Sequence, residues 1–141
     1  MTTLNFPDVN VWLALMWRRH AHAERAQRWF DKAGSERFFF CRITQMGVLR
    51  LLTTERALGS DVRTMAGAWK LWDEITADER IALIGEPEGL ERLFRKASRL
   101  PSPSPKVWAD SYLLGFAEAA GLNLVTFDQA LGSRGNRVLI L

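Results

Sequence analysis

The chain has 141 residues, of which 48% are apolar and 25% charged, and this composition excludes an intrinsically disordered protein. A chain of this length builds one hydrophobic core, so residues 1–141 are predicted to form a single domain. Nineteen basic residues against 16 acidic ones give a net charge of +3, which permits a polyanionic partner without requiring one. The single cysteine, Cys41, excludes a disulfide framework and a cysteine-rich zinc site.

Neither a membrane span nor a signal peptide is expected. The apolar run Val9–Trp17 is interrupted by Asn10 and is too short to cross a bilayer. Arg18 and Arg19 follow this run, whereas a signal peptide carries its basic residues before the apolar part. We therefore expect a soluble protein with no membrane contact, and the lone cysteine favours the reducing cytoplasm.

Short extended segments alternate with helices in the first half of the chain. Pro7 ends a strand, Gly34 caps a helix and Asp61 is placed to cap another, whose apolar stripe includes Met65, Trp69 and Trp72. The elements expected there are a strand over Leu4–Phe6, helices over Val9–Arg19 and Ala21–Ala33, a strand over Arg37–Cys41, a helix over Ile43–Thr54 and a helix from Asp61 to about Thr76.

The second half continues this alternation. Ser104 and Pro105 form a helix start signal, and the helix that follows is expected to bury Trp108 and to end at Gly121. The other elements expected there are a strand over Ile81–Ile84, an amphipathic helix over Glu88–Arg99, and strands over Leu122–Phe127 and Arg137–Leu141. This order of elements predicts an α/β fold, in which helices cover both faces of a mainly parallel sheet.

Three aspartates fall at or near the expected carboxyl ends of strands, where parallel sheets bind ligands. Asp8 follows the first strand, Asp128 follows the strand Leu122–Phe127, and Asp110 lies in the second turn of the helix that leads into that strand. Converging carboxylates repel one another unless a cation neutralises them, and such oxygen ligands suit Mg²⁺ or Mn²⁺. A divalent ion held in this way activates water and stabilises a phosphate in its transition state.

Each aspartate also has a simpler interpretation. Asp8 and Asp128 could each cap the helix or turn that follows, and Asp110 could favour the positive end of its own helix. Capping aspartates are common, so any one of the three taken alone favours the simpler role. Because all three fall at the same predicted edge of the sheet, a metal site is the better interpretation of the set.

Four segments occur in a fixed order along nearly the whole chain: Phe6–Leu15, Thr44–Thr53, Trp108–Leu113 and Val125–Asp128. In this order and spacing they resemble the PIN-domain ribonucleases, and within them the VapC-type toxins of bacterial toxin–antitoxin pairs. The resemblance implies a PIN-like three-layer sandwich with a mainly parallel five-stranded sheet flanked by helices. It also implies Mg²⁺- or Mn²⁺-dependent cleavage of RNA phosphodiester bonds, with Asp8, Asp110 and Asp128 as metal ligands or water-activating groups.

Two further residues match polar positions of that family. Thr126 is expected to hydrogen-bond a ligating carboxylate or water, although threonine is also an ordinary strand residue. Gln45 stands where the family commonly carries a glutamate. Its amide oxygen can still ligate a cation or hold a water in the catalytic site, but the missing negative charge should weaken metal binding. A domain that only binds RNA or a protein partner therefore stays open as an alternative.

A basic stretch precedes the segment that carries Asp110. Arg92, Arg95 and Arg99 share one helix face and, with Lys106, are predicted to guide RNA past the scissile position. The alternative is an ordinary solvated helix face. The family resemblance also implies a small antitoxin whose tail covers the acidic groove, and a homodimer.

Two other interpretations of the residues were weighed. A phosphatase with an aspartate nucleophile is suggested by Asp8, but such enzymes carry a second acid two residues later, and Asn10 stands at that position. His20 and His22 could join a metal or carry a proton. We interpret them as surface residues and leave them out of the catalytic set.

Overall fold

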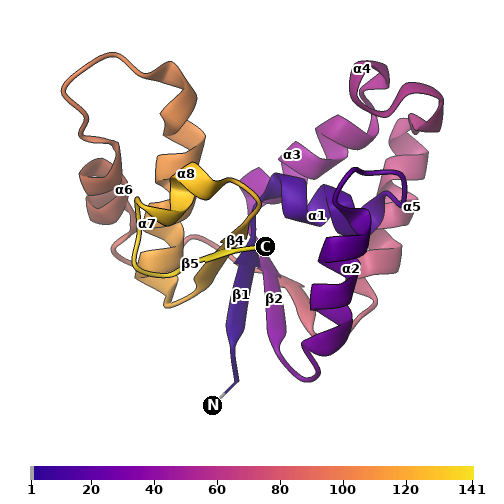
Figure 1. The fold of residues 1–141 in the computed structure, drawn as a ribbon, viewed down its shortest axis with the longest axis horizontal. Coiled ribbons are helices and arrows are strands. Elements are labelled where there is room, and N and C mark those ends of the chain that lie inside the picture. Colours follow the sequence, from indigo (N-terminus) through magenta and orange to yellow (C-terminus); the bar gives the residue numbers. More distant parts are fainter. Residues whose placement is uncertain (1) are drawn as a thin grey trace.

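A five-stranded, all-parallel sheet forms the centre of the molecule (Figure 1). The computed structural model describes residues 2–141, so residue 1, where the predicted domain begins, lies outside the described residues. The strands are β1 (Leu4–Pro7), β2 (Arg37–Phe40), β3 (Ile81–Leu83), β4 (Asn123–Thr126) and β5 (Val138–Ile140), in the spatial order β3-β2-β1-β4-β5. The predicted α/β fold with a parallel sheet is confirmed.

The strand order places β1 at the centre, with β2 on one side and β4 on the other. Asn5 of β1 pairs with Phe38 of β2 and with Asn123 of β4, so the carboxyl ends of the three strands lie at one edge of the sheet. The chain leaves β1 toward β2 and returns to β4 on the other side of β1. Ligands of open parallel sheets bind in the crevice at such a reversal, here between β1 and β4.

Helices cover both faces of the sheet. Trp12 stacks on Phe40 with ring centroids 3.8 Å apart in the core on one face, and Phe6 stacks on Phe116 at 4.8 Å in the core on the other. Side chains alternate between the faces of a strand, which places Phe39 in the core opposite to that of Phe40. The helices are α1 (Val9–Met16), α2 (Ala23–Lys32), α3 (Arg42–Leu52), α4 (Glu55–Leu58), α5 (Met65–Thr76), α6 (Leu90–Ser98), α7 (Trp108–Ala120) and α8 (Gln129–Gly132).

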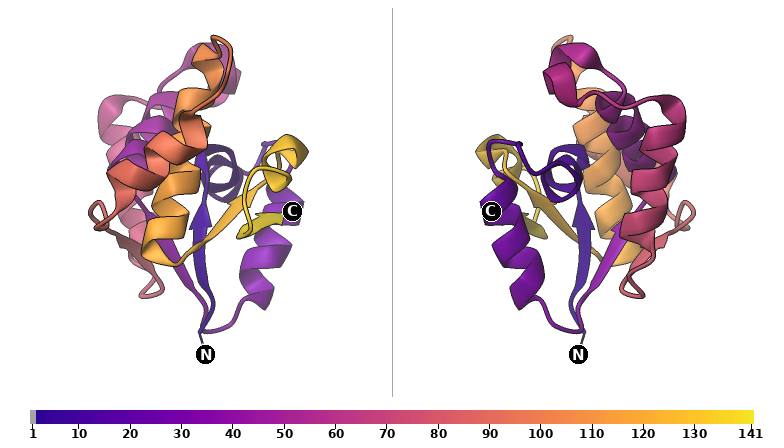
Figure 2. Two further views of the ribbon diagram at one scale, coloured as in Figure 1. Left: turned by 90° about the vertical axis from the view of Figure 1, so that its left-hand side faces the viewer. Right: turned by 90° about the vertical axis from the view of Figure 1, so that its right-hand side faces the viewer.

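Two groups of helices stand on either side of the carboxyl ends of the strands. Figure 1 shows α6 and α7 on one side and α3, α4 and α5 on the other, with β1 and β2 pointing between them. The side views of Figure 2 show α6 and α7 lying side by side along their length. Within residues 2–141, no helix is both long and apolar enough to cross a membrane.

The helix predicted from Asp61 to about Thr76 is present, but its predicted start at Asp61 is wrong. The chain forms α4 and a short 3₁₀ turn instead, and α5 begins after Thr64, whose hydroxyl accepts a hydrogen bond from the N–H of Gly67 (3.0 Å). The carboxylate of Asp61 accepts from the indole N–H of Trp17 (2.8 Å) and from Arg19 (3.4 Å). These partners lie just beyond the end of α1, which stops at Met16 rather than at Arg19. Long-range contacts therefore displaced the local capping role.

The start of α7 also differs from the prediction. Ser104 makes no capping hydrogen bond, and Pro105–Val107 form a 3₁₀ turn, so α7 begins at Trp108. Asp110 consequently lies in the first turn of this helix and not in the second. Trp108 was predicted to be buried but has 58% of its surface exposed. Met65 and Trp69, on the apolar stripe of α5, are also exposed, at 72% and 49%. The helical periodicity identified both helices but not their first residues, and Trp108, Met65 and Trp69 lie exposed rather than in the core.

Gly115 of α7 lies where α6 comes closest. A Cβ atom at this position would lie 2.8 Å from the backbone nitrogen of Phe94 and 3.0 Å from the carbonyl carbon of Leu93. We predict that Gly115→Ala forces the two helices apart. Overpacking costs about 1–3 kcal/mol or more against rigid backbone, which exceeds the helix-propensity gain of about 1 kcal/mol. Urea unfolding should therefore show a lower midpoint.

Gly85→Ala is the matched control for this variant. Gly85 does not have a positive φ, and a Cβ atom there would meet nothing within 4 Å. Its midpoint should stay close to that of the parent chain. Equal midpoints for the two variants would contradict the close approach of α6 to α7.

Candidate active site

Asp8 lies at the carboxyl end of β1, in the crevice beside β4. Its backbone N–H donates to the carbonyl of Val125 (2.9 Å), which extends the pairing of β1 with β4 beyond the last residue of β1. Its Oδ1 accepts from the N–H of Val11 (3.0 Å) and caps α1. The capping role considered for Asp8 is therefore confirmed. Capping occupies Oδ1 and leaves Oδ2 for other contacts.

The hydroxyl of Thr126 connects the two strand ends. Thr126 is fully buried, and its Oγ1 donates to Oδ2 of Asp8 at 2.6 Å. The same oxygen accepts from the backbone N–H of Asp128 (3.0 Å). A hydroxyl has one proton, so its donation to Asp8 and its acceptance from Asp128 are compatible. One buried side chain therefore fixes the relative position of Asp8 and of the turn that carries Asp128.

Asp128 is exposed and stands immediately before α8. Its Oδ1 accepts from the N–H of Ala130 (2.9 Å), so the capping role considered for Asp128 is also confirmed. As in Asp8, the cap uses one carboxylate oxygen. Oδ2 of Asp128 makes no hydrogen bond within the part of the chain that the structure describes.

Asp110 lies in the first turn of α7. Burial raises the pKa of Asp110, the charge of Asp128 raises it further, and the guanidinium of Arg134 lowers it. Burial likewise raises the pKa of Asp8; the hydrogen bonds from Thr126 and Val11 oppose this shift, and the charge of Asp110 adds to it. The charge of Asp110 therefore acts on Asp8 and that of Asp128 on Asp110, so the fold places the three predicted aspartates in one electrostatic neighbourhood.

The donor atoms of this neighbourhood are oxygens of the kind that hard divalent cations prefer. The carboxylates repel one another, and a bound cation would relieve this repulsion. In residues 2–141, however, no three His, Cys, Asp or Glu side chains converge as a ready-made metal cluster. The residues fit a divalent cation in chemistry, while their side chains stand apart from one another.

Gln45 is placed near this edge of the sheet by α3, which begins directly after β2. The side chain is buried, with 5% of its surface exposed, and its Oε1 accepts from a guanidinium N–H of Arg42 (2.7 Å). No hydrogen bond joins Gln45 to any of the three aspartates within the described residues. The structure thus assigns Gln45 an arginine partner that the sequence pattern did not predict.

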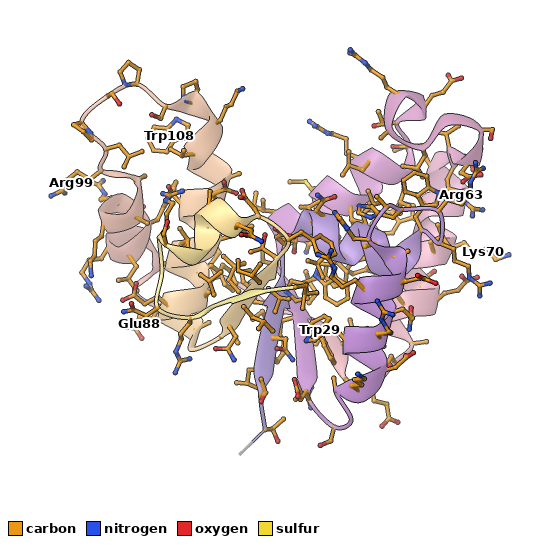
Figure 3. The ribbon with its side chains drawn as sticks, viewed as in Figure 1. Trp29, Arg63, Lys70, Glu88, Arg99 and Trp108 are labelled. Atoms are coloured by element: carbon orange, nitrogen blue, oxygen red, sulfur yellow. The ribbon has the colours of Figure 1, made fainter. Side chains whose placement is uncertain are left out.

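The predicted RNA-contacting cations all lie on the surface of the α6–α7 side. Arg92, Arg95, Arg99 and Lys106 are exposed. Arg95 donates to a carboxylate oxygen of Glu91 (2.6 Å), which partly neutralises it. Arg99 follows the last residue of α6, and Figure 3 shows its side chain pointing away from α7. None of the four hydrogen-bonds to Asp8, Asp110 or Asp128 within residues 2–141.

Like Arg137, Arg134 follows Asp128 in the sequence and could contact phosphate, although its position alone does not decide this. Its guanidinium donates to the hydroxyl of Ser111 (2.8 Å) and to the carbonyl of Ala97 (3.0 Å). Ser111 is fully buried and adjoins Asp110 in the sequence. Arg134 therefore ties the segment after α8 to the ends of α6 and α7. The only sequence signal for this role was its position six residues after the last acidic motif.

The histidine pair lies beside the site. His20 hydrogen-bonds Asn10 through Nε2 (3.1 Å), and its Nδ1 accepts from the backbone N–H of His22 (3.0 Å). The two rings pack around Phe127, which immediately precedes Asp128. Because Nδ1 accepts a hydrogen bond, Nε2 carries the proton of a neutral His20, and burial lowers the pKa of this side chain. The pair supports the loop between α1 and α2, and among residues 2–141 neither histidine hydrogen-bonds to any of the three aspartates.

Comparison with known proteins identifies the class that this sheet and these carboxylates define. The family model for the PIN domain matches residues 6–135. The chain belongs to the PIN domain family, and its sequence relatives place it among the VapC-type members. Ribonuclease VapC41 of Mycobacterium tuberculosis is 41% identical over 133 residues, which cover 91% of each chain.

Solved structures agree with this fold. VapC20 of Mycobacterium tuberculosis, described as a toxin that cleaves the sarcin–ricin loop, superposes with a TM-score of 0.67 at 17% identity and covers 92% of this chain and 94% of its own. The DNA-bound VapBC from Salmonella typhimurium gives a TM-score of 0.65 at 16% identity, over 100% and 98% of the two chains. The predicted PIN-like architecture, a five-stranded sheet flanked by helices, is confirmed.

We predict that Thr126→Val raises the pKa of Asp8 in the metal-free protein, because the hydrogen bond from Thr126 lowers that pKa. Thr126→Ser keeps the hydroxyl and should leave the pKa near the parent value. Carbon-13 NMR titration of the Asp8 carboxyl group measures this shift. An unchanged or lower pKa in the valine variant would contradict the assigned hydrogen bond.

The same substitution predicts a pH-dependent loss of stability. The variant leaves the backbone N–H of Asp128 without its acceptor, at a cost of about 1–3 kcal/mol. The folded-state pKa of Asp8 lies above its ordinary value, so the ionised carboxylate costs folding free energy once the pH rises through that pKa. The difference in unfolding free energy between parent and Thr126→Val should therefore be larger at neutral pH than in acid.

Proposed function

We propose that this chain is a divalent-metal-dependent endoribonuclease and the toxin of a VapBC-type toxin–antitoxin pair. The observation that carries the proposal is the link from Asp8 through the hydroxyl of Thr126 to the backbone of Asp128, at the carboxyl edge of a PIN-domain sheet with Asp110 in the first turn of α7. A relative that is 41% identical over most of both chains is named a ribonuclease, which supports RNA as the substrate.

Asp8, Asp110 and Asp128 would hold the cation, which we take to be Mg²⁺ or Mn²⁺. When bound, such an ion offsets the charge of the phosphate and makes a coordinated water more acidic. Gln45 would contribute its amide oxygen to the ion's surroundings or to a water. In this role the side-chain oxygen of Gln45 would contact the ion or the water and would still accept the hydrogen bond from Arg42.

The chain's own groups position the reacting atoms. Thr126 holds Oδ2 of Asp8 in one orientation, and the backbone caps hold Oδ1 of Asp8 and of Asp128. The carboxylate of Asp110 and Oδ2 of Asp128 are left to orient the attacking water and accept its proton. Hydrolysis then adds water across one P–O bond, and one product carries the phosphate while the other carries the released hydroxyl.

The exposed cations Arg92, Arg95, Arg99 and Lys106 are proposed to attract the RNA backbone over a distance. Charge on this side of the molecule raises the local concentration of a polyanion even without a fixed contact. Arg95 should contribute least because Glu91 neutralises part of its charge.

An antitoxin protein and a second copy of the chain are the proposed partners. Structures with the same fold include the toxin–antitoxin complex from Klebsiella pneumoniae, which covers 96% of this chain at a TM-score of 0.60. An antitoxin bound over the carboxylates would keep RNA away from them. The phosphatase alternative loses its basis, because PIN-family membership accounts for Asp8 without a nucleophilic role.

We predict that Asp110→Asn removes manganese-dependent cleavage of cellular RNA and leaves the fold unchanged. The loss should exceed about 100-fold, because even partners outside the first ligand shell of a metal cost about 10–100-fold. Gel analysis of RNA cut by purified protein, with Mn²⁺ and with chelator, measures the effect, and circular dichroism checks the fold. Asp73→Asn is the matched control, since Asp73 is an exposed aspartate on α5. Full activity of the Asp110 variant would exclude the assignment.

Gln45→Glu tests the effect of the missing acid. One more negative charge near a divalent ion contributes more than 1 kcal/mol at an effective dielectric constant near 20, so Mn²⁺ should bind about tenfold more tightly. Calorimetric titration of the metal-free protein measures this affinity. If neither the parent nor this variant binds Mn²⁺ or cuts RNA, the alternative of a binding-only domain replaces the nuclease.

A further inference from the structure

A hollow of about 550 Å³ lies between α6, α7 and the segment that joins α8 to β5. Its size falls within the range of about 300–1,000 Å³ that is typical of ligand sites. Leu93, Leu114 and Leu124 form part of an apolar floor. Three cations line the hollow, Lys96, Arg134 and Arg137, against the single acid Glu118.

Of these three cations, Lys96 belongs to the basic stretch before Asp110, whereas Arg134 and Arg137 follow Asp128 in the sequence. Leu93, Lys96 and Ala97 of α6 line the hollow, whereas Arg92, Arg95 and Arg99 do not. The helix therefore has two basic faces. The face with Lys96 meets two cations from the far end of the chain, Arg134 and Arg137, which no local pattern could associate with it.

The hollow is connected to the three carboxylates through Arg134. This side chain lines the hollow and also donates to Ser111, the residue after Asp110 (2.8 Å). Ser133 and Arg134 follow α8, whose N-cap is Asp128. A ligand in the hollow would therefore lie beside the segments that carry two of the three proposed metal ligands.

We propose that this hollow binds the RNA segment next to the scissile phosphate, an inference that rests on the proposed nuclease function. Lys96 and Arg137 contact backbone phosphates, Arg134 faces the phosphate nearest to the carboxylates, and the apolar floor accepts a base or ribose. Charge complementarity favours RNA, because a polyanion meets three cations and one acid. The apolar floor suits unpaired nucleotides, whose bases expose flat apolar faces.

The test uses RNA binding without cleavage. Fluorescence anisotropy is measured with a fluorescein-labelled, single-stranded RNA of mixed sequence, on the full chain carrying Asp110→Asn and in chelator. Lys96→Ala with Arg137→Ala should weaken binding about tenfold and reduce the slope of log affinity against log salt by about 1 per residue. Both side chains are exposed, so thermal unfolding should stay unchanged. Arg134 is kept because its two hydrogen bonds support the fold.

Arg28→Ala with Lys70→Ala is the matched control, because it removes the same charge from exposed positions on α2 and α5. Figure 3 shows Lys70 on the side of the molecule opposite to α6. Equal losses of RNA affinity in the two double variants would show that only net charge matters and would overturn the proposed site. Unchanged RNA affinity, with weaker binding of an acidic protein partner, would assign the hollow to that partner and also overturn it.

Failure of this inference can be told apart from failure of the nuclease proposal. Cleavage that needs Asp110, combined with normal RNA binding by the Lys96 and Arg137 double variant, would retain the nuclease and exclude the hollow. RNA binding that depends on Lys96 and Arg137, without cleavage by the parent chain in Mn²⁺, would retain the hollow as an RNA site and exclude the nuclease.

Discussion

The hydrogen bond from Thr126 to Asp8 is the contact on which the candidate site depends. It is short, at 2.6 Å, starts from a fully buried side chain and joins residues 118 positions apart in the sequence. The same hydroxyl accepts from the backbone of Asp128, so the first and last acidic motifs share one fixed point. Asp8 and Asp128 carry like charges, and a flexible arrangement would let them separate. The buried Thr126 holds these two negative charges in the crevice between β1 and β4, and their repulsion costs folding free energy.

Two sources of positive charge offset that cost. Within the chain, Arg134 reaches from the segment after α8 to the start of α7, and its charge acts on Asp110. The second source is the proposed divalent ion, which would bind where the carboxylates repel one another most. Helix capping is compatible with both, because Asp8 and Asp128 each cap through Oδ1 and keep a second oxygen. The capping interpretation of Asp8 and Asp128 is therefore confirmed, and their role as metal ligands stays a proposal that capping permits.

How much the sequence could predict depended on how far apart the interacting residues lie. Asp8 and Asp128 were placed correctly at strand ends, since the change from strand to helix is encoded within a few residues. Asp61 was misassigned because its partners Trp17 and Arg19 lie 44 and 42 residues away. The contacts of Arg134 span 23 and 37 residues, and they depend on the packing of α6 against α7. Lys96, Arg134 and Arg137 are recognisable as basic residues in the sequence, but for the same reason it could not show that they line one hollow.

The glutamine at position 45 connects the hollow with the proposed metal site, because it leaves that site with fewer acids. A glutamate there would add a fourth negative charge to a crevice that already raises the pKa of Asp8 and of Asp110. The buried amide avoids this repulsion, keeps its bond from Arg42 and leaves fewer charged ligands for an ion. Magnesium is commonly held by one or two carboxylates together with substrate phosphates. The proposed site, with fewer acids, would therefore rely more on phosphate oxygens of the RNA, which the cations of the hollow would hold beside Asp110.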